Sequence, residues 1–173
     1  DCQTLDVQPI ALPSQMQVVV QWVAARTLVG SAYADRVAQC AQAEKEIGPL
    51  RLASVADTAQ IADAVVRARA LHVVSENERV RQAAECLQAG DARGFGLLMN
   101  ESHESLRSNF AVSTEQMDDA VKQAQALPGV YGARMTGGGF GGCIVMVAES
   151  DARLPENDNM WRVRAVGGAA IIS

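Results

Sequence analysis

A glycine-rich segment between two strand-like segments constrains the fold of this chain more than any other feature. Gly137-Gly138-Gly139-Phe140-Gly141-Gly142 contains five of the 14 glycines in the sequence. The flanking segments, Val130–Met135 and Cys143–Val147, have the β-branched and apolar residues typical of strands. We therefore expect two strands joined by a loop with an open backbone, because glycine permits positive φ and has no side chain to block an approaching group.

Spacing alone leaves two interpretations of this loop open. One is an anion site built from converging backbone amides, and the other is a tight connection in which glycines relieve crowding. A Walker loop is excluded, because no Gly-Lys-Ser/Thr follows to supply a lysine to phosphates. A dinucleotide fingerprint is excluded too, since Cys143–Val147 continues as a strand where that motif requires a helix.

Hydrophobic periodicity predicts further strands and several helices around this loop. Met16–Val23 is a continuous apolar run that predicts a central strand buried on both faces, and an apolar pattern from Val163 to Ile172 predicts a last strand. The predicted helices run from Ser31 to Ile47; from near Asp57, with Ile61, Val65 and Ala68 on one face; through Val80, Ala84 and Leu87; from Asp91 to Leu106; and from a capping box of Ser113 and Gln116 to Pro128. The second and third are compatible with one bent helix.

Composition indicates a folded domain and excludes several functions. Apolar residues make up 49% of the 173 positions and charged residues 20%, as in ordinary globular proteins. The net charge of -5 disfavours nucleic acid as a partner, and the 4% of aromatic residues leaves few rings to stack on bases. No apolar run approaches the ~18 residues that cross a bilayer, and Asp1–Thr4 resembles no secretory leader, so we expect no membrane contact and a cytoplasmic location.

The cysteines, histidines and acidic pairs have no spacing typical of a catalytic or metal site. Four cysteines, at positions 2, 40, 86 and 143, lack paired zinc spacing and are expected to be free thiols. We assign His72 and His103 structural roles, because no Cys or acidic pattern accompanies them. Asp118-Asp119 is interpreted as a solvated helix face.

Four segments of the chain together resemble a known family. Tyr131-Gly132-Ala133-Arg134-Met135-Thr136 followed by the glycine cluster and Cys143 resembles, almost letter for letter, the third signature motif of galactokinases, members of the GHMP small-molecule kinase superfamily. Ser31-Ala32-Tyr33 with Arg36, His72–Asn77 and Leu98–Arg107 are similar to further family segments in the same order. The beginning of the chain, Asp1–Leu5, resembles a strand midway through a galactokinase, so the resemblance points to the C-terminal half.

The resemblance implies both a fold and a division of the chain. The expected fold is α+β, the ferredoxin-like C-terminal domain of GHMP kinases, with an antiparallel sheet of about four strands covered by helices. Residues 1–148 are assigned to the galactokinase-like C-terminal domain, although the opening strand is equally compatible with a preceding N-terminal domain. Residues 149–173 are assigned to a divergent tail that could add a last strand.

Galactokinases transfer the ATP γ-phosphate to the 1-hydroxyl of galactose, a phosphotransfer to an alcohol acceptor that depends on positioning and charge stabilisation. The resemblance therefore implies galactose as substrate and ATP and Mg²⁺ as cofactors. It also implies that the sugar-recognition motif, the phosphate loop with its Mg²⁺ ligands and the catalytic aspartate lie upstream of Asp1. On this chain it implies a substrate-binding residue, Tyr33, and a segment supporting the phosphate loop: Thr136, Gly137, Gly138, Gly139, Phe140, Gly141 and Gly142.

With no catalytic or metal-binding residue assigned to it, the isolated chain is expected to be inactive. It is also expected to self-associate through the apolar face that another domain would cover. Two alternatives stay open: a non-catalytic sugar- or nucleotide-binding module, and another GHMP sugar kinase such as an N-acetylgalactosamine kinase. For Tyr33 the alternative is a core aromatic on a stripe with Val37 and Cys40.

Overall fold

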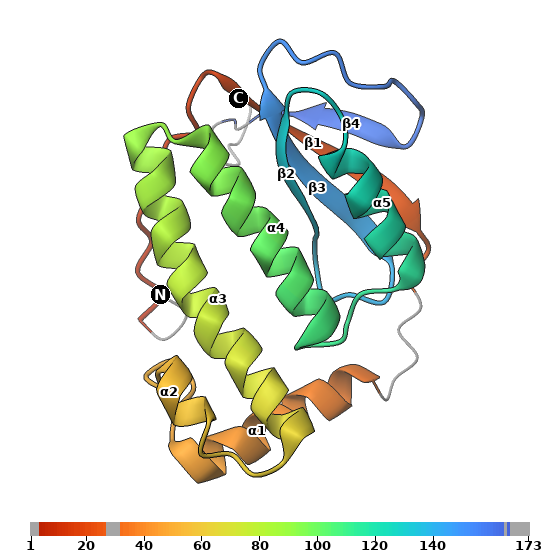
Figure 1. Ribbon diagram of the computed structural model, residues 1–173. Coiled ribbons are helices and arrows are strands. Elements are labelled where there is room, and N and C mark those ends of the chain that lie inside the picture. The colour runs from red at the N-terminus through yellow and green to blue at the C-terminus, as the bar shows by residue number, and fades with distance from the viewer. Residues whose placement is uncertain (1–3, 27–31, 165, 167–173) are drawn as a thin grey trace, which may run out of the picture.

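The computed structural model describes residues 4–26, 32–164 and 166, and a four-stranded antiparallel sheet lies at its centre (Figure 1). The strands are β1 (Met16–Ala24), β2 (Val130–Met135), β3 (Gly142–Glu149) and β4 (Met160–Val163), in the order β2-β3-β1-β4. The predicted α+β class, with about four antiparallel strands and covering helices, is confirmed.

Two details of the strands differ from the prediction. β1 is an interior strand, but only Met16 and Val19 on it are buried and Trp22 is 42% exposed, so burial of both faces was a wrong expectation. The physical reason is that the helices cover β1 only in part. The last strand begins earlier than predicted, at Met160, where it pairs with β1; positions 165 and 167–173 lie outside the described residues.

Five helices accompany the sheet in the described part of the chain: α1 (Ala32–Ile47), α2 (Val55–Thr58), α3 (Ala64–Ala89), α4 (Ala92–Ser108) and α5 (Glu115–Gln125). Figure 1 shows α3 and α4 side by side, with α1 and α2 gathered at the N-terminal end of α3. The sharp turn between α3 and α4 depends on Gly90, which adopts φ 71°, and on the Asp91 carboxylate, which accepts a hydrogen bond from the Gly94 amide. Within the described ranges, no helix combines the length and the apolar character needed to span a membrane.

Two helices begin at residues other than those predicted, because different side chains cap them. A helix does lie near Asp57, but it is the short α2; the Asp63 carboxylate accepts hydrogen bonds from the amides of residues 65 and 66, so α3 begins separately at Ala64. The predicted face with Ile61 and Val65 is therefore wrong: Ile61 is fully buried in the cluster between α1 and α3, whereas Val65 is 48% exposed. At α5 the N-cap is Thr114 and not Ser113.

The two faces of the sheet pack against different helices. On one face, Ile144 and Met146 of β3 are fully buried in a core cluster to which α5 contributes Met117. On the opposite face, Val147 joins a smaller cluster with Met99 of α4. The division follows from the alternation of side chains along a strand.

Helix α4 lies against β2 at unusually short backbone distance. A Cβ on Gly96 would lie 2.3 Å from the carbonyl oxygen of Tyr131, and a Cβ on Gly132 would lie 2.0 Å from that of Gly96. Only glycine is compatible with this approach.

This contact predicts a large effect for a single methyl group. Gly96→Ala should lower the free energy of unfolding by about 2–3 kcal/mol because of overpacking against β2. Alanine alone would stabilise a helix interior by ~1 kcal/mol relative to glycine, so a net loss would isolate the effect of the contact. Urea unfolding measures it, with Leu97→Ala, on an exposed side chain, as the control. A stabilised Gly96→Ala variant would contradict the close approach.

Candidate functional site

The glycine loop, Thr136–Gly142, connects β2 to β3. Its first residue continues the ladder, since the Thr136 amide donates to the Cys143 carbonyl over 3.0 Å. Five of its residues, Gly137, Gly139, Phe140, Gly141 and Gly142, adopt positive φ between 60° and 113°. A Cβ on Gly137 or Gly142 would meet nothing within 4 Å, so the backbone is open to an approaching group at both ends of the loop.

Two contacts hold the middle of this loop. The Phe140 amide donates to the Val112 carbonyl over 2.8 Å, and the Phe140 ring packs against the core cluster beneath α5. These contacts hold a non-glycine residue at φ 60°. A Cβ on Gly139 would lie 2.4 Å from the same Val112 carbonyl oxygen, so the loop lies directly on this peptide group.

A guanidinium group lies beside the loop. Arg26, two residues after β1, lies so close that a Cβ on Gly138 would be 2.4 Å from its Nη2 atom. A cation next to an open glycine backbone makes the local electrostatics suitable for an anion. Sequence reasoning missed Arg26, because nothing in the sequence indicates that the end of β1 lies over the loop.

Tyr33 lies in the first turn of α1 and is 56% exposed, so the alternative that it is a core aromatic is wrong. It lines a hollow of about 540 Å³ together with Arg36 of the same helix and Phe110. Ser31, the first residue of this motif, lies outside the described residues. The role of Tyr33 as a substrate-binding residue stays a prediction.

The segment Asn109–Val112, between α4 and α5, lies between Tyr33's helix and the glycine loop. Its four successive carbonyls accept hydrogen bonds from three different directions. Arg69 of α3 donates to the Asn109 carbonyl, and Arg36 of α1 donates from Nε to Phe110 over 2.6 Å and from Nη2 to Ala111 over 2.9 Å. The fourth carbonyl, of Val112, accepts the Phe140 amide. The segment thus connects the two predicted parts of the site.

His72 supports this segment from α3. Its ring stacks on Phe110, with centroids 4.5 Å apart, and its Nδ1 lies 2.9 Å from the Ser105 hydroxyl. Burial lowers the pKa of His72 to about 4, against the opposing effect of Glu76. The imidazole is therefore neutral at pH 7, and the predicted structural role of this histidine agrees with its position.

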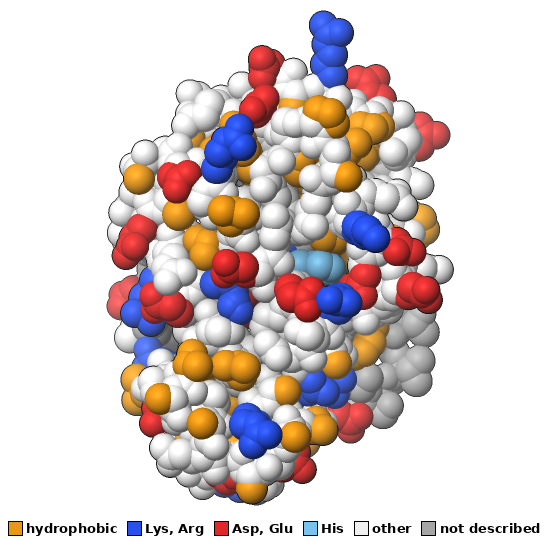
Figure 2. Space-filling model, in the orientation of Figure 1, with side chains coloured by type: hydrophobic (Ala, Val, Ile, Leu, Met, Phe, Trp, Pro, Cys, Tyr) orange, Lys and Arg blue, Asp and Glu red, His pale blue; other side chains and the backbone are white. Residues whose placement is uncertain are grey.

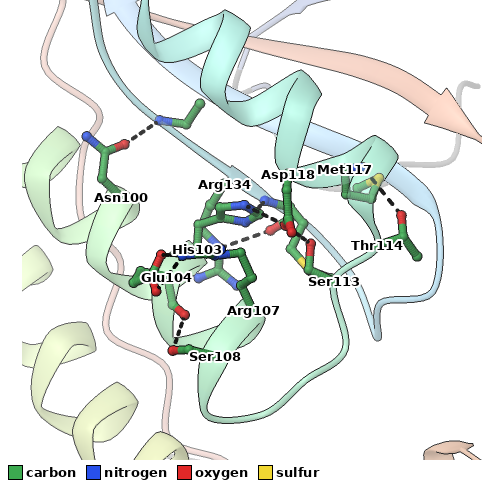
Figure 3. A network of polar contacts seen from close by, with 12 residues as sticks. Asn100, His103, Glu104, Arg107, Ser108, Ser113, Thr114, Met117, Asp118 and Arg134 are labelled. Carbon is green, nitrogen blue, oxygen red and sulfur yellow. Dashed lines mark hydrogen bonds and ion pairs between the residues drawn. The ribbon is translucent and has the colours of Figure 1, made fainter.

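A second polar network fixes the end of β2 from which the loop starts (Figure 3). His103 of α4 accepts the Met135 amide at Nδ1 over 3.4 Å, and its Nε2 lies 3.3 Å from Asp118 of α5. Asp118 also accepts the Ser113 hydroxyl over 2.5 Å, so the interpretation of Asp118 as part of a solvated face is wrong. Burial is the main cause that lowers the pKa of His103. Asn100 anchors β2 one step earlier by accepting the Ala133 amide over 2.9 Å.

The described residues contain no group of three or more His, Cys, Asp or Glu side chains placed to hold a metal ion. Three cysteines, at positions 40, 86 and 143, are free thiols as predicted, and Cys2 lies outside the described residues. Burial and the nearby Glu44 raise the pKa of the Cys40 thiol, which leaves it protonated and unreactive at neutral pH.

Comparison with known proteins shows what the chain is similar to. Residues 83–156, which include α4, α5 and the glycine loop, match the family model of the GHMP kinase C-terminal domain. The chain is 44% identical over 160 residues to a galactokinase of Roseiflexus sp. (strain RS-1) and 40% identical over 159 residues to a galactokinase of Homo sapiens. The alignments cover 86% and 88% of this chain but 41% of each relative, so the chain spans less than half the length of these proteins.

Solved structures support the same assignment. The galactokinase of Lactococcus lactis, determined in complex with galactose, superposes with a TM-score of 0.79 at 34% identity over 87% of this chain and 42% of that one. The mevalonate kinase of L. major shares the fold, with a TM-score of 0.59 and 24% identity over 90% of this chain and 44% of that one. The GHMP C-terminal fold expected from the sequence is therefore confirmed.

The site shows what sequence patterns can and cannot reveal. Thr136–Gly142 forms one loop, as predicted, and Tyr33 lies on a separate helix that is joined to it through Asn109–Val112. Arg36 lies in the same sequence motif as Tyr33 but was assigned no role, although its position one helical turn from Tyr33 places it near the same site. The carbonyl acceptors carried no signal, because every residue has one.

The lowered histidine pKa values predict an acid-sensitive fold. Because the pKa of His72 is near 6.5 in the unfolded chain and about 4 in the folded one, the unfolded chain binds more protons between these values. The neutral, buried His72 therefore contributes fully to the free energy of unfolding above pH 6.5. This contribution is lost as the pH falls toward 4, which lowers the free energy of unfolding by on the order of 2–3 kcal/mol. Chemical unfolding of the wild type and of His72→Gln across this range measures it. His103→Gln serves as the comparison, and equal slopes for wild type and His72→Gln would contradict the assignment.

Proposed function

We propose that this chain is the C-terminal part of a galactokinase, an enzyme that transfers the ATP γ-phosphate to the 1-hydroxyl of galactose. The observation that carries the proposal is the joint placement of the glycine loop and Tyr33 around Asn109–Val112, in a chain 40–44% identical to galactokinases over most of its length. The complete protein acts on galactose and ATP, and a cytoplasmic location agrees with its free thiols.

Each wall of the site has a role in this proposal. The open backbone at Gly137 and Gly142, with Arg26 beside the loop, supports the phosphate-binding loop of the remaining part of the enzyme. Tyr33 lines the galactose pocket, which we place at the hollow between Tyr33, Arg36 and Phe110. ATP bound to the complete enzyme supplies the phosphoryl group. The catalytic aspartate and the Mg²⁺ ligands are assigned to that remaining part, as the resemblance to galactokinases implies.

A chimeric enzyme tests this proposal. This chain would replace the matching C-terminal part of the Roseiflexus galactokinase, to which it is 44% identical. We expect galactose-dependent ADP release from the chimera and none from the chain alone. Tyr33→Ala in the chimera should raise KM for galactose about fivefold and leave KM for ATP unchanged, because an aromatic wall contributes ~1 kcal/mol to sugar binding.

Val55→Ala is the matched control, since Val55 is exposed to a similar extent, at 54%, and does not line the hollow at Tyr33. A folded chimera without activity on galactose would overturn the proposal. Activity on N-acetylgalactosamine in place of galactose would favour the related sugar kinase. Heat of galactose or ATP binding to the chain alone, measured by calorimetry, would favour a stand-alone binding module.

An exposed apolar surface motivates a second proposal, self-association of the isolated chain. Trp22 of β1 lies diagonally across from Trp161 of β4, and Val163 follows on the same face; all three are more than 40% exposed. Figure 2 shows hydrophobic side chains spread among charged groups of both signs on the face turned to the viewer. Such a patch in contact with water favours association.

Sedimentation of the isolated chain at increasing concentration measures this association. We expect a rising average mass and a shift toward monomer in Trp161→Gln, because the substitution removes apolar area at the centre of the patch. Leu5→Gln, which changes an exposed residue away from the sheet, is the control. A wild-type chain that stays monomeric at high concentration would contradict the proposal.

A further inference from the structure

We propose that Arg36 is a positioning residue that couples helix α1, and with it Tyr33, to the glycine loop through the carbonyls of Asn109–Val112. The mechanical coupling is a property of this chain. Its use in sugar phosphorylation, where Tyr33 and the loop line the two substrates, rests on the function proposed above.

The coupling begins with the geometry of the Arg36 guanidinium. Its three nitrogens donate in three directions: Nε to Phe110, Nη2 to Ala111 and Nη1 to Gln39 over 3.2 Å. A planar fork bound to two successive carbonyls fixes both the distance and the angle of the backbone. Tyr33 lies one helical turn before Arg36, so whatever fixes Arg36 also fixes the start of α1.

The coupling continues along the backbone to the loop. Ala111, whose carbonyl Arg36 holds, adopts φ 52°, and the next carbonyl, of Val112, accepts the Phe140 amide. Peptide planarity leaves two soft torsions between the Ala111 and Val112 carbonyls, so a shift of one reorients the other. A shift of α1 is therefore transmitted to Phe140 over a single residue.

Arg36 is distinct from the neighbouring Arg69. Arg69 also donates to the segment, at Asn109, and shares the Gln39 side-chain oxygen with Arg36. Arg69 comes from α3, however, so it ties the segment directly to that helix and reaches Tyr33's helix only through the Gln39 side chain of α1. Among the described residues, both hydrogen bonds that join α1 directly to this segment come from Arg36.

Amide hydrogen exchange of the full chain, followed by NMR, tests the coupling without requiring catalysis. Arg36→Met should raise the exchange rate of the Phe140 amide about tenfold, because its acceptor on Val112 is no longer held in place. The amides of Ile144 and Met146 in β3 should change less than about twofold, which a general loss of stability would not allow. Arg107→Met, which removes a guanidinium paired with Glu104, is the matched control and should leave Phe140 unchanged.

Two further variants keep the test decisive if Arg36→Met folds poorly. Arg36→Lys retains the charge but cannot form the fork, so it should give an exchange rate between those of wild type and Arg36→Met. Gly139→Ala acts from the opposite end by pressing on the Val112 carbonyl, and it should shift the NMR signals of the Tyr33 ring. Gly137→Ala has the same left-handed backbone but no neighbour within 4 Å, and should leave Tyr33 unchanged.

Unchanged Phe140 exchange in a folded Arg36→Met variant would overturn the proposal, as would an equal acceleration of all slow amides. In an active chimera, Arg36→Met should change both kcat and KM for galactose, whereas Tyr33→Ala changes KM alone. A chimera that is inactive with Arg36 intact would count against the proposed function, while the exchange result would still decide the coupling.

Discussion

The contact between Gly96 of α4 and Gly132 of β2 sets the geometry on which the rest of the site depends. Because neither residue has a Cβ, the helix lies directly on the edge of the sheet. This distance allows Asn100 and His103, on successive turns of α4, to accept the amides of Ala133 and Met135. The same placement brings the end of α4 beside the glycine loop. Two glycines that weaken secondary structure locally are therefore required for tertiary structure.

Hydrogen bonds from two arginines to backbone carbonyls fix the position of the segment after α4. They also place two positive charges close together, which is electrostatically unfavourable. Burial and the proximity of Arg36 lower the pKa of Arg69, which shows that the two like charges oppose each other. Carbonyl dipoles and the Gln39 oxygen offset this repulsion, and the guanidinium fork matches successive carbonyls in a way that a lysine ammonium cannot. Apolar packing alone would hold this connection without repulsion between two arginines. The arginine–carbonyl bonds therefore favour a precise backbone position over maximal stability.

The sequence predicted those parts of the structure that depend on local pattern. The strands around the glycine loop, the helix ending at Ile47 and the central place of β1 follow from hydrophobic periodicity and glycine punctuation. The errors at Asp63 and Thr114 arose because several residues near each helix start can act as a cap, and tertiary packing selects one of them. The carbonyls of Asn109–Val112 and the position of Arg26 depend on contacts between distant segments, which periodicity does not describe.

The two predicted walls of the site present different chemical groups. The glycine loop presents open backbone and the Arg26 cation, and the hollow at Tyr33 presents an aromatic side chain together with the Glu44 carboxylate. Phosphoryl transfer needs a site that excludes water and holds compensating charge on several sides of the phosphate. Both walls lie on the surface, and β1 carries the exposed Trp22 four residues before Arg26. A partner domain that buries the apolar surface of β1 would therefore also shield the loop from water, because one hydrophobic contact would serve both purposes.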